Sequence, residues 1–120
     1  MKARAIARFT VAYGRLRLRV RLLPTIADVD AEYRSGQRRR NGEIVHAFFA
    51  PANSATAAHI GTVVLPADGR LAELVPHEAT HAAMHRIGGV HCTADERLAT
   101  TVGLLSARIF TGLKRRGMEV

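Results

Sequence analysis

The sequence predicts an α+β fold in which a small mixed or antiparallel sheet packs on helices. Residues 15–22 alternate strictly between arginine and an aliphatic residue, which is the period of a β-strand with one buried face. In residues 98–109, apolar side chains recur every three or four positions, which is the period of an amphipathic α-helix. A chain of 120 residues can bury one modest core, so we expect residues 1–120 to form a single domain.

Composition and charge narrow the classes of protein and partner. The chain is 48% hydrophobic, which is typical of a globular protein, and no apolar run is long enough to span a membrane. Its formal net charge of +8 suits either a polyanionic partner such as nucleic acid or a basic solvated surface. Cys92 is the only cysteine, which excludes an intrachain disulfide and favours a reducing compartment, so we expect a cytoplasmic protein without a membrane partner.

The N-terminal segments predict a β-hairpin. Residues 8–11 also alternate, and Tyr13-Gly14 can turn this strand into the strand at 15–22. The second strand then carries one row of aliphatic side chains and one row of arginines, namely Arg15, Arg17, Arg19 and Arg21. This row is either a solvated face or a nucleic-acid footprint; the solvated face is favoured because no aromatic side chains are interleaved for base stacking.

The middle of the chain predicts one helix and two more strands. Thr25 and Asp28 form a capping-box pattern for a helix that ends near Gly36. Residues 43–50 and 59–66 are rich in β-branched and aromatic residues and predict strands, and a turn follows at 66–69.

Two helices close the chain, and the first contains the pattern H-E-x-x-H. The helix is expected over 71–87, with Pro76 inside it, and the last helix over 93–116. His77 and His81 lie one helical turn apart on one face, about 6 Å along the axis, so both imidazoles can reach one metal ion. Glu78 would then lie beside the open position of the metal, where it can take a proton from a water molecule.

A catalytic zinc ion takes three protein ligands and keeps one position open, so a third ligand is needed. The candidates are His85, His91, Cys92, Asp95 and Glu96. His85 points away from the first two histidines, because each step of four residues rotates the direction by roughly 40°, and it suits the cleft better. We favour Glu96, because it shares a helix face with small residues at 99, 100, 103 and 107 that would allow close packing on the H-E-x-x-H helix. The alternative is that Glu96 caps its own helix together with Thr93.

The segments HEATH (77–81) and DERLA (95–99) resemble the zincin metallopeptidases, in particular the gluzincin arrangement. The short spacing and His85 are similar to the ImmA/IrrE-like peptidases and to small phage-encoded domains of the same type. The resemblance covers about residues 58–107. It implies a minimal zincin core, with an active-site helix and a C-terminal ligand helix.

The same resemblance implies a role for each matching residue. His77, His81 and Glu96 match the zinc ligands, and Glu78 matches the general base of peptide-bond hydrolysis. The expected cofactor is Zn²⁺ and the expected partner is a peptide or protein substrate. We further expect the strand at 59–65 to be the edge that pairs with an extended substrate, and His85, His59 and Asp95 to lie near the cleft.

A non-enzymatic protein is the alternative. In it, the zinc site would serve folding, and the arginine row would bind nucleic acid or an acidic protein. Glu78 discriminates between the two, because a structural metal site needs the histidines but not the base.

Overall fold

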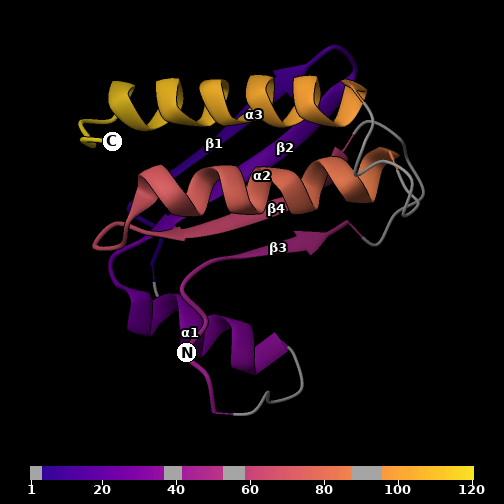
Figure 1. Ribbon diagram of the computed structural model, residues 1–120. Coiled ribbons are helices and arrows are strands. Elements are labelled where there is room, and N and C mark those ends of the chain that lie inside the picture. Colours follow the sequence, from indigo (N-terminus) through magenta and orange to yellow (C-terminus); the bar gives the residue numbers. More distant parts are fainter. Residues whose placement is uncertain (1–3, 37–41, 53–58, 88–95) are drawn as a thin grey trace.

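A computed structural model describes residues 4–36, 42–52, 59–87 and 96–120. Its elements confirm the α+β class, with four strands in one mixed sheet and three helices. In chain order they are β1 (Ala7–Tyr13), β2 (Leu16–Leu23), α1 (Ile26–Gly36), β3 (Phe48–Pro51), β4 (His59–Pro66), α2 (Leu71–Ile87) and α3 (Glu96–Arg115). Figure 1 shows α2 and α3 side by side across the sheet, with α1 apart from them.

The strand order is β1-β2-β4-β3, so β1 and β3 form the two edges. β1 and β2 are antiparallel, β2 and β4 are parallel, and β3 and β4 are antiparallel. The expectation that the strand at 59–65 is an edge is therefore wrong, because β4 is paired on both sides. The physical reason lies in its side chains: Val63, Val64 and Leu65 are at most 2% exposed, so both faces of β4 are covered.

The predicted hairpin is confirmed. β1 and β2 pair from Ala7–Leu22 to Tyr13–Leu16, and Gly14 supplies the positive φ of 58° that the turn between them needs. Leu18 and Val20 are fully buried, whereas Arg17 and Arg19 point to the exposed face. Two arginines depart from the predicted row, because Arg15 lies in the turn and Arg21 pairs with Glu32 of α1.

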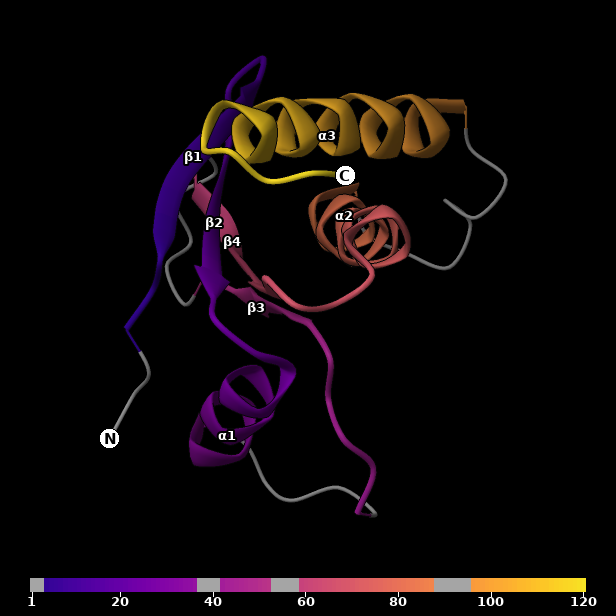
Figure 2. The ribbon, with the colours of Figure 1, turned by 90° about the vertical axis from the view of Figure 1, so that its left-hand side faces the viewer.

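α1 begins as the sequence predicts. The Thr25 amide donates to Asp28 Oδ2 (3.2 Å), and the Asp28 amide donates to Thr25 Oγ1 (3.1 Å), which is the reciprocal capping box. The helix packs on the end of the arginine-bearing face of the sheet, through Val29 against Leu23 and Val64. Figure 2 shows α1 beyond the ends of the strands, apart from α3.

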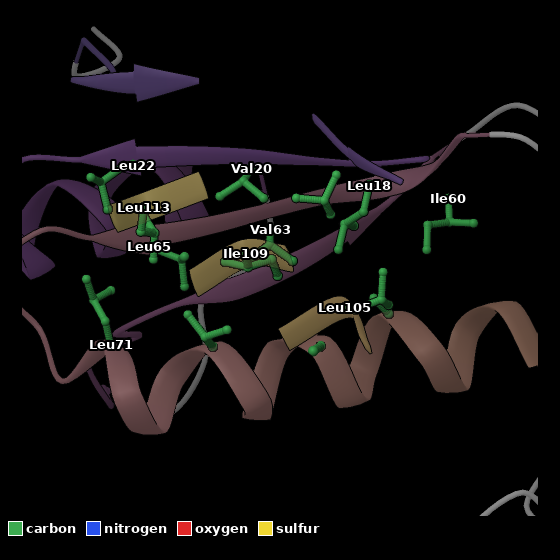
Figure 3. Close-up of a cluster of buried hydrophobic side chains, with 14 residues drawn as sticks. Leu18, Val20, Leu22, Ile60, Val63, Leu65, Leu71, Leu105, Ile109 and Leu113 are labelled. Carbon is green, nitrogen blue, oxygen red and sulfur yellow. The ribbon is translucent and has the colours of Figure 1, made fainter. Parts of the chain in front are cut away.

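The main core lies between the other face of the sheet and the two long helices. β2 and β4 contribute an aliphatic row that meets apolar side chains of α2 and α3 (Figure 3). Its members include Leu18, Val20, Leu22, Ile60, Val63, Leu65, Leu71, Leu105, Ile109 and Leu113. This packing fixes α2 against the sheet, and α2 carries the H-E-x-x-H residues.

The small residues of α3 do not pack as predicted. Ala99, Thr100, Gly103 and Ala107 are all exposed. α3 instead meets the sheet and α2 through Leu98, Leu105 and Ile109, because burying these large side chains removes far more apolar area from water. One glycine of α3 does permit close packing, because a Cβ on Gly112 would collide with the Phe9 ring of β1.

β3 is shorter than the strand expected at 43–50. It spans Phe48–Pro51, and residues 43–47 belong to no helix or strand. The Asp30 carboxylate of α1 holds this segment by accepting a hydrogen bond from the Val45 amide (2.9 Å).

No helix within the described part of the chain has the length and apolar character needed to cross a membrane.

Candidate metal centre and cleft

α2 presents the three motif residues in two different environments. His77 and His81 lie on its exposed side, together with His85 one turn further on. Glu78 is turned toward the protein and is only 4% exposed, next to the fully buried Ala79 and Ala82. The helix continues through Pro76, which sits at its sixth residue and removes one backbone hydrogen bond without ending the helix.

The two imidazoles converge on a common point. Nε2 of His77 and Nε2 of His81 are 3.2 Å apart, with ring centroids 4.9 Å apart and ring planes inclined by 74°. Two nitrogens bound to a tetrahedral zinc ion at about 2.0–2.1 Å would lie about 3.3 Å from each other. The observed separation of the two nitrogens is therefore close to that expected for a shared zinc ion.

The lowered pKa of His81 favours metal binding. Partial burial lowers the pKa of His81, and the neighbouring His77 lowers this pKa further. Both effects favour the neutral imidazole, which is the form that binds a metal ion.

Glu78 is a buried carboxylate close to His77. Its side chain is 5% exposed, and its Oε2 lies 3.9 Å from His77 Nε2. Burial raises the pKa of Glu78, while His77 acts in the opposite direction with a smaller effect. A carboxylate with a raised pKa takes a proton more readily than an ordinary surface glutamate.

The motif residues open onto a cleft of about 760 Å³ between α2, β3 and the segment at 43–47. Its polar lining comes from the three histidines of α2, from Glu78, Glu43 and Tyr33. The other lining residues are largely apolar: Ile44, Val45, Ala47, Phe48, Phe49, Pro51 and Met84. The cleft is thus open, mostly apolar, and has the candidate metal ligands and base on one wall.

His85 and Tyr33 are polar residues of this cleft outside the motif. His85 lines the cleft as expected, with its ring centroid 5.7 Å from that of Phe49. Tyr33 reaches the cleft from α1, and its ring contacts that of Phe48 edge to face with centroids 5.3 Å apart. No sequence signal places Tyr33 here, because the contact depends on how α1 packs on the sheet.

The remaining candidate residues lie elsewhere or outside the described residues. His59 begins β4 opposite Arg17 and does not line the cleft as the structure describes it. His91, Cys92 and Asp95 fall outside the described residues, and so does the side chain of Glu96, the first residue of α3. Among the side chains that are described, no group of three metal-ligating residues occurs.

One wall of the cleft depends on Asp30. Hydrogen bonds from the Val45 amide, and then from Arg34 Nε (2.8 Å), lower the pKa of Asp30. A lowered folded-state pKa gives stability that is present above the ordinary pKa and is lost as the pH falls through the folded-state value. We expect Asp30→Asn to lower the free energy of unfolding at pH 7, and the difference from wild type to shrink as the pH falls below the ordinary pKa of 3.8. Urea unfolding at several pH values measures this difference, with the exposed Glu73→Gln as control. An equal difference at every pH would contradict the charge-dependent role.

Comparison with protein-family models, with curated proteins and with solved structures found no match for this chain. The case for a zinc site therefore depends on the residue types and their geometry alone. Two imidazoles with nitrogens 3.2 Å apart and a buried carboxylate next to them are residue types that catalytic zinc centres use.

Proposed function

We propose that this chain is a zinc-dependent peptidase in which His77 and His81 bind the metal and Glu78 is the general base. The observation that carries the proposal is the 3.2 Å approach of the two Nε2 atoms beside a buried glutamate, at the wall of an open cleft. At this distance the two imidazoles can share a hydrogen bond, and a metal ion would bind both nitrogens in its place. A buried carboxylate is costly unless it is paired, and ionisable groups in such environments cluster at functional sites.

Zinc bound by these histidines would lower the pKa of water toward about 7 and polarise a carbonyl oxygen. Glu78 accepts a proton from the water molecule as its oxygen attacks the carbonyl carbon of a peptide bond. The same carboxyl group then delivers the proton to the leaving amide nitrogen, which departs as an amine. His85 and Tyr33 are the polar side chains of the cleft that could hydrogen-bond the carbonyl oxygen as charge develops on it.

The cleft favours an extended substrate with an apolar side chain. β3 is the edge strand beside the cleft, so its free edge, rather than that of β4, is available to pair with a substrate backbone. Ile44 is 60% exposed although it lines the cleft with Val45 and Phe48, and a substrate side chain can cover it. The single cysteine is compatible with action in the cytoplasm.

For the third ligand we propose Glu96, although the close packing expected for its helix face is absent. The rival is a cap at the start of α3. We expect one zinc per chain in the wild type, and at least about a tenfold weaker zinc affinity in Glu96→Ala. A competitive titration with a zinc-binding dye measures the affinity.

His91→Ala is the matched variant for that titration, since His91 lies on the same connection. An unchanged affinity in Glu96→Ala together with a loss in His91→Ala would assign the third position to His91. For the activity itself, a zinc-loaded sample should hydrolyse a mixed fluorogenic peptide library and stop on chelation; zinc content without hydrolysis would reject the enzyme.

The second candidate is a non-catalytic zinc protein that binds a polyanion. It is supported by the exposed Arg17 and Arg19 and by the net charge of +8. The predicted row of four is reduced, however, because Arg21 is paired with Glu32 and Arg15 lies in the turn. Arg17 also donates to the carbonyls of Gly14 and Leu16, which orients its guanidinium toward the hairpin's own backbone.

A further inference from the structure

The acidic residues of this protein are concentrated away from β1 and β2. The acids of the described residues lie mainly on α1, on the segment after it and around α2: Asp28, Asp30, Glu32, Glu43, Asp68, Glu73 and Glu78, with Glu119 near the C-terminus. β1 and β2 contain no acid, and α3 contains none after Glu96. The edge of the sheet opposite the cleft is therefore basic.

A groove runs along the free edge of β1. It has a volume of about 370 Å³ and lies between β1 and the C-terminal half of α3. Phe9, Thr10, Val11 and Ala12 all line it, and consecutive strand residues point to opposite faces. The groove therefore follows the backbone edge rather than one face of the sheet. Figure 2 shows β1 as the outermost strand beside α3.

The backbone of this edge has groups free to pair with another strand. Tyr13 and Leu16 flank a two-residue turn, so they form a hydrogen-bonded pair, and such pairs recur at every second position. The register makes Val11–Leu18 and Phe9–Val20 the next bonded pairs. The N–H and C=O groups of Thr10 and Ala12 therefore point away from β2, toward the groove.

Arginines flank the edge on both faces. Exposed Arg108 and Arg115 of α3 lie seven residues apart on one helix face and line the groove. On the other face of the sheet, Arg8 and Arg19 line a depression together with Thr10. A strand added to β1 would thus have guanidinium groups above and below it.

We infer that the β1 edge docks an extended acidic segment of a partner protein, which adds to the sheet as a fifth strand. Backbone pairing supplies the affinity, and carboxylates that meet the arginines supply the selection. A second copy of this chain does not fit, because two such edges would bring arginines against arginines. Nucleic acid fits this site less well, because it cannot pair with a strand edge. It also cannot stack a base on Phe9, because the Arg116 guanidinium lies over that ring, 4.3 Å from its centroid. The inference does not rest on the proposed peptidase activity, because the cleft lies at the opposite edge.

Fluorescence anisotropy with a labelled decapeptide of alternating glutamate and valine tests the inference. We expect this peptide to bind and a lysine–valine decapeptide not to bind. Arg115→Glu should weaken binding by roughly fivefold or more. Arg70→Glu is the matched control, because it changes the net charge equally at an exposed site outside the groove, and it should have little effect.

Amide hydrogen exchange of the wild-type protein tests the strand pairing without any variant. Adding the acidic peptide should slow exchange at Thr10 and Ala12 and leave Phe9 and Val11 unchanged. Thr10→Pro removes one edge donor and should reduce peptide binding, with circular dichroism as a check of folding. Equal binding of the lysine peptide, equal effects of Arg115→Glu and Arg70→Glu, or duplex DNA binding without protection at Thr10 and Ala12 would each overturn the inference.

Discussion

Glu78→Gln should abolish peptide hydrolysis while the protein keeps its zinc. The substitution preserves the size of the side chain but removes the carboxylate that accepts the proton of water. Loss of a positioned general base typically costs about 10²–10⁴-fold in rate. The expected result is a fall of that size in the hydrolysis rate of a fluorogenic peptide, with zinc content and the circular dichroism spectrum unchanged. Glu73→Gln is a suitable control, since Glu73 lies on the same helix but is exposed.

The same substitution has a consequence for the metal-free protein that a purely catalytic role would not give. Burial raises the folded-state pKa of Glu78, so its contribution to stability is greatest below the ordinary pKa. It is lost as the pH rises through the folded-state value. With a chelator present, Glu78→Gln should therefore be more stable than wild type at pH 7, and this gain should disappear near pH 4. Urea unfolding at the two pH values measures this gain. A variant less stable than wild type at pH 7 would contradict the claim that the buried charge of Glu78 destabilises the metal-free protein.

The local parts of the fold could be predicted because nearby residues determine them. The hairpin follows from the alternation of arginine with aliphatic residues and from Gly14, and the start of α1 follows from Thr25 and Asp28. His77 and His81 lie on one face of α2 because they are four residues apart, which is about one helical turn. The convergence of His77 and His81 is a direct result of that spacing.

The long-range parts could not be predicted in the same way. The central place of β4 depends on pairing with β2 and β3, although the consecutive apolar residues Val63, Val64 and Leu65 are typical of a strand covered on both faces. The small residues of α3 were expected to pack, but large apolar residues on the opposite face compete more strongly for burial. Tyr33 enters the cleft only through the packing of α1, which no periodicity in the sequence reveals.

His81→Ala should remove zinc binding almost completely. His81 supplies one of the two converging nitrogens, and its lowered pKa keeps that nitrogen unprotonated at neutral pH. Loss of residues that only orient a ligand already weakens metal affinity about 10–100-fold, so loss of a ligand itself should exceed about 100-fold. The competitive zinc titration measures this change directly.

His85→Ala is the matched control, because it removes an exposed imidazole from the next turn of the same helix and should leave zinc affinity nearly unchanged. Thermal stability gives a second measurement. Zinc at 100 times its dissociation constant should stabilise the wild type and His85→Ala by about 2.7 kcal/mol, and His81→Ala hardly at all. Equal zinc affinity in His81→Ala and His85→Ala would place the metal elsewhere. A metal bound by the converging nitrogens of His77 and His81 must lose affinity when His81 is removed, and His85 supplies neither nitrogen.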